Sequence, residues 1–263
     1  MKIGMIGLGN MGEAILSGIL EKGIVKKEEV IGSAASRQTT ERIAKAYGIA
    51  VTLDNREVAC LDVVILAVKP QYLEDVIGQI RDIVKTNTLL ITIAAGKCIE
   101  WYEQAFGKEI KLVRCMPNTP AMVGEGCSAV CANQNVTETE RELVLELLGS
   151  LGRTYIIREG LIDAFSAIAG SSPAYVFMFL EAMADAGVAA GMPRGQAIEV
   201  AAQAVLGSAK LLLETGKHPG ELKDMVCSPG GTTIQGVRTL EEQGMRGAVI
   251  DALLACVERA GKL

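Results

Sequence analysis

The stretch "KIGMIGLGNMGEAILSGIL", residues 2–20, decides how the first half of the chain folds. Its first six residues have the pattern of a short buried strand, and the residues after Gly12 have the spacing of an amphipathic helix. Gly7, Gly9 and Gly12 stand between the two as G-x-G-x-x-G. There the first two glycines permit a turn and the close approach of a pyrophosphate, and the third lets the helix pack on the strand. The stretch therefore predicts a dinucleotide site at the motif and its neighbours: Ile6, Gly7, Leu8, Gly9, Asn10, Met11 and Gly12.

The alternation of strand-like and helix-like segments continues to about residue 158. Short β-rich runs such as "EVIGS", "DVVILAV", "TLLITIA" and "KLVRCM" alternate with helical patterns such as "TTERIAKAYG" and "ERELVLELLGSLG". Continuous apolar strands indicate a sheet covered on both faces, mostly parallel. We expect an α/β fold in which residues 1–158 form a Rossmann-type, doubly wound domain.

From residue 159 to residue 263 the strand signals stop and the pattern is helical throughout. The run "SPAYVFMFLEAMADAGVAAGMP" offers Ser172 as an N-cap and Pro173 as the first helical residue. It and the following run "RGQAIEVAAQAVLGSAKLLLETG" are apolar around most of their circumference. Such helices need cover on several sides, so we expect an all-helical domain that pairs with a second subunit.

Composition excludes several classes of protein. The chain has 263 residues, 49% hydrophobic and 22% charged, with a net charge of -5. An acidic chain lacks the basic footprint of a nucleic-acid-binding surface, and charges interrupt the apolar helices, so we expect neither nucleic acid nor membrane as a partner. Seven scattered cysteines and one histidine support neither a disulfide framework nor a metal site. The first residues read as a strand rather than as a signal peptide, which predicts a cytoplasmic protein.

The form of the dinucleotide depends on the end of the second strand, where NAD-binding proteins place an acidic residue for the ribose. Here the sequence is "GSAASRQTT", with Ser36 and Arg37 and no acidic residue. A guanidinium group with hydroxyls suits a 2'-phosphate, which favours NADPH over NADH. The alternative for Arg37 is an ordinary solvated helix start.

Two further strand ends are candidate cofactor contacts, because ligands of this fold lie at the carboxyl ends of parallel strands. The first is "AVKP", comprising Ala67, Val68, Lys69 and Pro70, and the second begins at Ala94. Lys69 is a candidate for the nicotinamide ribose, unless it only covers the end of the sheet.

No usual proton donor for a carbonyl reduction is evident. The single histidine, His218, lies in a turn, and neither Lys210 nor Lys223 has an asparagine one turn further along its helix. An imine can bind already protonated and accept hydride without a separate strong acid, so the sequence fits C=N reduction better. The loop "CSPGGTTIQG", residues 227–236, offers backbone amides at a helix start for a carboxylate, with Thr232 or Thr233 as the cap. A plain capped helix start is the alternative.

Motifs along the whole chain resemble those of the pyrroline-5-carboxylate reductase family. They are "GLGNMG", "AVKP", "RCMPNTP", "GSSPAYVF", "HPGELKD" and "CSPGGTTIQGV", in the family's order and spacing. That family reduces 1-pyrroline-5-carboxylate, a cyclic imine bearing a carboxylate, to L-proline with NAD(P)H. Met225 departs from the pattern, since some members have an asparagine there.

The resemblance implies roles for particular residues. Gly231 and the amides of Thr232 and Thr233 would bind the substrate carboxylate, and the Thr233 hydroxyl would lie near the ring nitrogen. Glu159 falls at a substrate position, and Asn55 and Asn118 at cofactor positions. The resemblance also implies a dimer through the second domain, assembling into a ring such as a decamer. The alternatives are a β-hydroxyacid dehydrogenase or other imine reductase of the same architecture, and a non-enzymatic NADP-binding protein.

Overall fold

A computed structural model describes residues 1–261 and contains one twisted sheet. Across these residues the sheet has eight strands in the order β3-β2-β1-β4-β5-β6-β7-β8, all parallel except β7 against β6. The order reverses beside β1, which confirms the predicted doubly wound, mostly parallel sheet. The strands are β1 (Ile3–Ile6), β2 (Val30–Ser33), β3 (Ala50–Thr52), β4 (Val63–Leu66), β5 (Leu89–Thr92), β6 (Lys111–Met116), β7 (Gly126–Ala132) and β8 (Gly152–Ile156).

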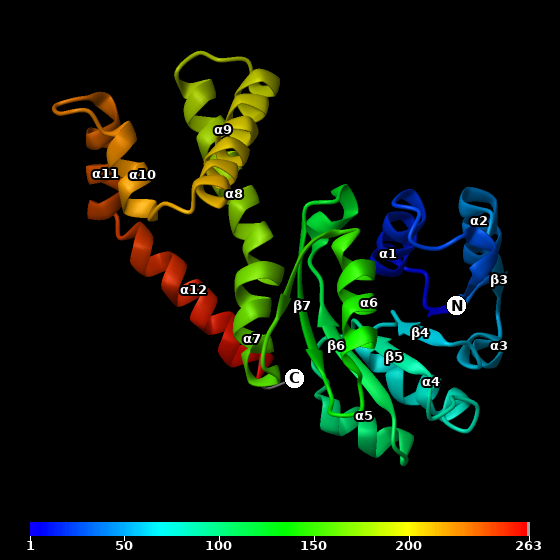
Figure 1. Cartoon of the computed structure of the whole chain (residues 1–263). Coiled ribbons are helices and arrows are strands. Elements are labelled where there is room, and N and C mark those ends of the chain that lie inside the picture. Colours follow the sequence, from blue (N-terminus) through cyan, green and yellow to red (C-terminus); the bar gives the residue numbers. More distant parts are fainter. Residues whose placement is uncertain (262–263) are drawn as a thin grey trace. The chain divides into compact units, whose positions relative to one another are not determined.

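Helices cover both faces of this sheet (Figure 1). Side chains from α1 (Asn10–Glu21), α2 (Arg37–Tyr47) and α6 (Glu138–Gly149) share one apolar core with one face of the sheet. Those from α3 (Asn55–Ala59), α4 (Leu73–Ile80) and α5 (Ile99–Phe106) form the core on the other face. The result is a three-layer α/β/α arrangement.

The strands feed both cores because successive side chains point to opposite faces. Ile3 and Met5 of β1 lie in the core under α1, whereas Ile6 lies in the core under α4. All of β1, β4 and β5 is buried, which explains why these strands read as continuous apolar runs. Short elements escaped the sequence analysis: β3, α3 and α5 have only three, five and eight residues.

A helical stretch from Glu159 to Ala189 corrects one sequence expectation. It comprises the 3-10 turn η4 (Glu159–Leu161), α7 (Ile162–Phe165), the π-helical segment η5 (Ser166–Ser171) and α8 (Ser172–Ala189). Ser172 does not cap a helix, because the preceding Ser171 is already helical. Pro173 has no N–H for the carbonyl of Ala169, and the side-chain amide of Asn118 donates to that carbonyl instead, at 2.9 Å.

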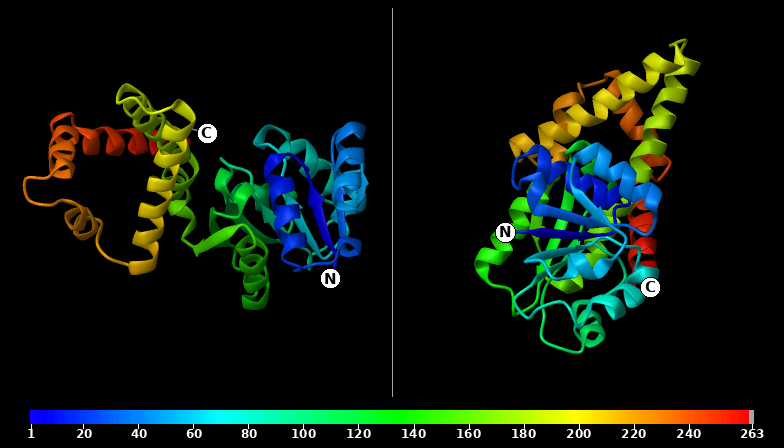
Figure 2. Two further views of the ribbon diagram at one scale, coloured as in Figure 1. Left: turned by 90° about the horizontal axis from the view of Figure 1, so that it is seen from above. Right: turned by 90° about the vertical axis from the view of Figure 1, so that its right-hand side faces the viewer.

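The chain divides into two compact units, Met1–Gly170 together with the residues from Val257 onward, and Ser171–Cys256. In the second unit α8 and α9 (Arg194–Thr215) lie side by side (Figures 1 and 2). They are followed by α10 (Pro219–Val226), α11 (Thr232–Glu242) and α12 (Met245–Ala260), the last of which ends in the first unit.

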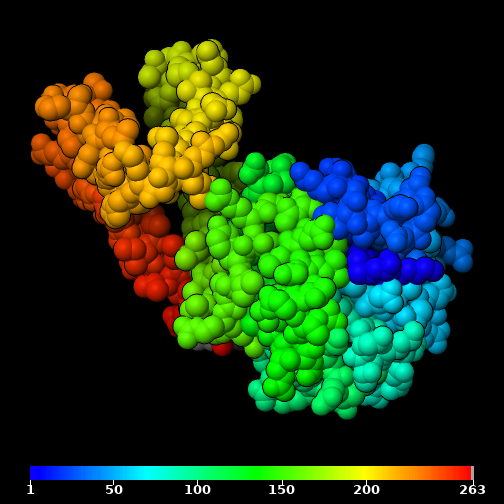
Figure 3. Space-filling model, in the orientation of Figure 1, coloured from blue at the N-terminus to red at the C-terminus, as the bar shows by residue number. Residues whose placement is uncertain are grey.

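The helical unit has almost no core of its own. Its only buried residues are Ala184, Ala197 and Ala201, whereas Phe177 and Met178 are 65% and 68% exposed. Figure 3 shows an open notch between α9 and the α10–α11 pair, coloured yellow and orange. Large apolar side chains in such numbers on a surface mark an interaction site, which agrees with the predicted need for a partner.

One helical stretch among residues 1–261, Glu159–Ala189, is long and apolar enough by length and composition to cross a membrane. A single such helix is weak evidence, because helices that pack against other protein surfaces pass the same test.

Candidate cofactor and substrate site

The glycine motif has the geometry that its sequence predicts. Gly7 directly follows β1 and has a positive φ of 96°, where a side chain would be strained and would collide with the Ala67 backbone. A Cβ on Gly12 would collide with the carbonyl of Gly7, so this glycine permits the close contact between α1 and β1. A Cβ on Gly9 would meet nothing within 4 Å. The backbone at Gly9 is thus open to a ligand.

The first turn of α1 leaves donors free for that ligand. Gly9 is the N-cap in extended conformation and no described side chain caps the helix. The amides that open α1 at Asn10 and Met11 therefore have no partner within the helix. Free amides and the positive end of the helix dipole suit a pyrophosphate. The open backbone and these donors together fit a dinucleotide.

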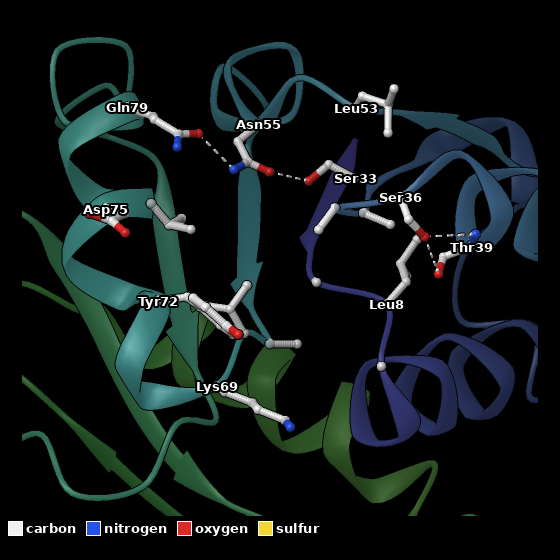
Figure 4. Close-up of a pocket in the computed structure, with 17 residues that line it drawn as sticks. Leu8, Ser33, Ser36, Thr39, Leu53, Asn55, Lys69, Tyr72, Asp75 and Gln79 are labelled. Carbon is white, nitrogen blue, oxygen red and sulfur yellow. Dashed lines mark hydrogen bonds between the residues drawn. The ribbon is translucent and has the colours of Figure 1, made fainter.

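A groove of about 530 Å³ runs from this motif across the carboxyl ends of β1, β2 and β4 (Figure 4). Half of the sixteen residues predicted to contact the cofactor line it: Gly7, Leu8, Gly9, Ser36, Asn55, Ala67, Val68 and Lys69. The structure thus brings together residues that are up to 62 positions apart, from Gly7 to Lys69. This convergence follows from the parallel sheet, whose strand ends meet at one edge.

The other predicted cofactor residues lie outside the groove lining. Ile6 is fully buried in the core, and Asn10, Met11 and Gly12 form the first turn of α1. Arg37 and Pro70 begin α2 and the 3-10 turn η2 (Pro70–Tyr72), while Ala94 is buried after β5. Asn118 is 8% exposed, and its amide is used twice, donating to Ala169 and accepting from the backbone N–H of Cys127.

Sequence analysis missed nine residues that line the groove. They are Ser33, Ala34, Ala35, Thr39, Leu53, Tyr72, Asp75, Val76 and Gln79. Ser33 to Ala35 follow directly from the strand end, so the position of β2 alone could have identified them. No recognisable motif marks the lining residues that come from η2 and α4, which are Tyr72, Asp75, Val76 and Gln79.

The start of α2 places the two residues expected to select NADPH. Ser36 is the N-cap, and its hydroxyl accepts the Thr39 N–H at 3.2 Å and lies 3.0 Å from the Thr39 hydroxyl. Arg37 is the first helical residue and is exposed. Its side chain does not line the groove in this conformation, although it is next in sequence to Ser36, which does.

A buried polar cluster supports the loop that carries Ala94. The Thr92 and Tyr102 hydroxyls are 2.6 Å apart, and burial raises the pKa of Tyr102 to about 12. Arg114, 6% exposed, donates to a Glu159 oxygen at 2.9 Å, and the same oxygen accepts the Ile99 N–H at 2.7 Å. Glu159, expected from the resemblance to contact substrate, thus has one oxygen engaged by these two donors.

The Gly-Gly-Thr-Thr stretch opens a helix, with one correction. Gly230 has a φ of 71°, and Gly231, rather than either threonine, is the N-cap of α11. Thr232 and Thr233 are therefore the first two helical residues, and both are exposed. A Cβ at this cap would meet the Ser228 hydroxyl, which would have to move. The amides of Thr232 and Thr233 have no partner within the helix and remain available.

The groove offers little acid–base chemistry. Among the described residues that line it, Lys69, Tyr72 and Asp75 are those with titratable side chains. His218 lies outside it, exposed, and its Nδ1 accepts the Gly220 N–H as the N-cap of α10. No group of three or more potential metal ligands exists among residues 1–261.

Two family models match the chain. One, described as pyrroline-5-carboxylate reductase dimerisation, matches residues 159–263, and the other, described as NADP oxidoreductase coenzyme F420-dependent, matches residues 2–96. Among solved structures, a pyrroline-5-carboxylate reductase from Coxiella burnetii is similar with a TM-score of 0.94 and 34% identity, covering 99% of this chain and 97% of that one. The pyrroline carboxylate reductase of Plasmodium falciparum, solved with NADP bound, is similar with a TM-score of 0.90 and 34% identity, covering 100% and 97%.

Curated relatives agree over the full length. The pyrroline-5-carboxylate reductase of Escherichia coli is 46% identical over 263 residues, covering 100% of this chain and 98% of the relative. The enzyme of that name from Glycine max is 37% identical over 262 residues, covering 99% and 95%. Because the likeness spans both the sheet and the helices at this identity, the chain belongs to the pyrroline-5-carboxylate reductase family.

Proposed function

We propose that this chain reduces the cyclic imine 1-pyrroline-5-carboxylate to L-proline with NADPH, NADH being a possible second cofactor. The main support for this proposal is the sequence identity of the chain with pyrroline-5-carboxylate reductases over its whole length, 46% in one case. The groove agrees, because it has a dinucleotide-binding geometry and lacks a histidine to protonate an alkoxide.

The cofactor's pyrophosphate would lie on the first turn of α1, above Gly9. The adenosine ribose would lie at the end of β2, near Ser36 and Asn55, and the nicotinamide half would follow the strand ends at Ala67 to Pro70 and at Ala94. When bound, NADPH supplies a hydride to the carbon of the C=N bond. Asn118 would contribute indirectly, by fixing the loop after β6 through its two hydrogen bonds.

The substrate carboxylate would accept hydrogen bonds from the free amides of Thr232 and Thr233 at the start of α11, which Gly231 leaves unobstructed. The Thr233 hydroxyl would hydrogen-bond the ring nitrogen, which changes from a protonated imine to an amine during the reduction. A protonated imine needs no separate acid, which fits the few titratable groups of the groove. Glu159 would contribute at the edge of the substrate site, with Arg114 holding its carboxylate in place.

We further propose that residues 1–158 are the cofactor domain and residues 159–263 the substrate and dimerisation domain. The match of a dimerisation model to residues 159–263 and the exposed apolar helices support self-association. Assembly of dimers into a ring such as a decamer, and a cytoplasmic location, are part of the same proposal.

A substrate panel tests the proposed function. At fixed enzyme concentration, NADPH oxidation is followed with 1-pyrroline-5-carboxylate, with larger cyclic imines and with keto acids. NADP⁺ reduction is followed with β-hydroxy acids. The proposal predicts that 1-pyrroline-5-carboxylate has the highest kcat/KM by at least tenfold. A preference for a hydroxyacid would support the β-hydroxyacid dehydrogenase alternative, and cofactor binding without any turnover would support a non-enzymatic protein.

A further inference from the structure

Three side chains join the two walls of the groove by hydrogen bonds (Figure 4). The Ser33 hydroxyl donates to Asn55 Oδ1 at 2.7 Å, and Asn55 Nδ2 donates to Gln79 Oε1 at 2.9 Å. Ser33 ends β2, Asn55 begins α3 and Gln79 lies in the last turn of α4. These residues, which we call the Ser33–Asn55–Gln79 relay, come from three separate elements and all line the groove.

The relay fixes the orientation of the Asn55 amide. Its oxygen is held toward Ser33 and one of its N–H groups toward Gln79, which leaves one N–H uncommitted. Ser33 is fully buried, so its hydroxyl is a fixed anchor. Gln79 is exposed and is the acceptor that determines where the nitrogen of the amide lies. Without that acceptor, only the bond to Ser33 would remain.

The relay also crosses the groove from one wall to the other, above the apolar core that α3 and α4 share. Leu53 and Asn55 line one wall of the groove. The other wall is lined by Tyr72, Val76 and Gln79. The Asn55–Gln79 bond crosses between them. In a doubly wound sheet the end of the second strand, here Ser33, is where the adenosine ribose binds. The relay therefore lies at the adenosine end of the groove.

We propose that Gln79 is a positioning residue for the adenosine half of the cofactor: it orients the Asn55 amide toward the ribose. The inference rests on the proposed function, because it takes the groove to be a dinucleotide site. Gln79 belongs to no motif, and its role follows only from the contact with Asn55.

Binding of 2',5'-ADP, measured by calorimetry on the full-length protein, tests the inference without turnover. Gln79→Leu removes the acceptor at nearly constant size, and the loss of one hydrogen bond predicts an affinity about 2- to 10-fold lower. In the reductase assay the KM for NADPH should rise by the same factor, while kcat and the KM for the imine stay within twofold. Gln104→Leu, an exposed glutamine on α5 outside the groove, is the matched control and should change neither quantity.

A double-mutant cycle separates positioning from a general structural effect. In an Asn55→Ala background, Gln79→Leu should have no further effect on 2',5'-ADP affinity, because the group it positions is gone. Gln79→Glu keeps an acceptor in place and should retain more affinity than Gln79→Leu. This comparison uses NADH, because NADH lacks the 2'-phosphate that a carboxylate would repel. Ser33→Ala, which removes the other end of the relay, should also weaken 2',5'-ADP, and it serves if Gln79→Leu does not fold.

The inference is overturned if Gln79→Leu binds 2',5'-ADP as tightly as the wild type, or if the two substitutions have additive effects. Wild-type protein that binds 2',5'-ADP but does not turn over the imine would contradict the proposed function alone. Wild-type protein that fails to bind 2',5'-ADP would contradict both.

Discussion

Thr233 presents two different hydrogen-bonding groups at the start of α11, a backbone amide and a side-chain hydroxyl. Thr233→Ala keeps the amide and removes only the hydroxyl. We expect kcat/KM for 1-pyrroline-5-carboxylate to fall about 10- to 100-fold, because the ring nitrogen loses a partner whose bond is worth about 0.5 to 3 kcal/mol. Steady-state kinetics measure this, and full activity would mean that the hydroxyl has no part in the reaction.

Gly231→Val is the matching backbone test of the same site. A Cβ at this N-cap collides with the Ser228 hydroxyl and shields the amides that follow, so substrate binding should suffer more than in Thr233→Ala. NADPH affinity should be unchanged in both variants, because the glycine motif lies in the other compact unit.

Arg37 begins α2 beside Ser36, where a 2'-phosphate would distinguish NADPH from NADH. Arg37→Asp replaces a positive charge by a negative one and should raise the KM for NADPH at least tenfold more than the KM for NADH, since a charge-assisted hydrogen bond is worth about 1.5 to 3 kcal/mol. The ratio of the two KM values is the measurement. Equal changes for both cofactors would exclude Arg37 from cofactor selection.

Residues could be predicted where a backbone requirement leaves a trace in the sequence. Gly7 and Gly12 are such cases, because their surroundings leave no room for a side chain. Gln79 and Tyr72 could not be predicted, since nothing in the sequence around them marks a position on the groove. The pairing of Arg114 with Glu159 was equally hidden, because it joins residues 45 positions apart.

At the scale of elements, one ion pair ties α1 to α2. Both terminal nitrogens of Arg42 donate to the Glu13 carboxylate at 2.7 Å, and these bonds hold the pKa of Glu13 below its usual 4.5. Glu13 lies in the first turn of α1, whose amides would face the pyrophosphate. The positive charge of Arg42 therefore balances the negative charge of the Glu13 carboxylate next to the proposed pyrophosphate site.

Arg42→Met should lower the melting temperature by about 1–3 °C at neutral pH, because the pair is partly exposed and screened. A carboxylate whose pKa is lowered in the fold stabilises it above pH 4.5, and this contribution is lost as the pH falls through the folded-state pKa. The difference between variant and wild type should thus vanish on acidification. A difference that persists at pH 2–3 would show that Arg42 contributes through packing.

Element types were predictable where the apolar pattern was long, and element ends were not. The caps illustrate the reason: Ser172 and the two threonines of residues 232–233 are good capping residues, yet η5 continues directly into α8 and Gly231 caps α11. At Ser172 the neighbouring structure overrides local preference, because Asn118 donates to the Ala169 carbonyl and the helix continues.

At the scale of the molecule, the helical unit exposes large apolar side chains that we propose a second subunit covers. Phe177 of α8 is 65% exposed, so Phe177→Asp should shift the protein from dimers or larger assemblies toward monomers, or destabilise it. Analytical ultracentrifugation at micromolar concentration measures the change, and Phe177→Leu, which stays apolar, should leave the assembly intact. A wild-type protein that sediments as a stable monomer would refute the pairing.

Isotope transfer shows whether hydride passes from the cofactor to the imine carbon of 1-pyrroline-5-carboxylate, as proposed. Purified protein is incubated with the imine and with NADPH deuterated at C4 of the nicotinamide, prepared in each of its two stereochemical forms, and the product is examined by NMR. We expect L-proline with one deuterium at C5 from one of the two forms, in an amount equal to the NADPH oxidised. NADPH oxidation without labelled proline, or no oxidation at all, would contradict it.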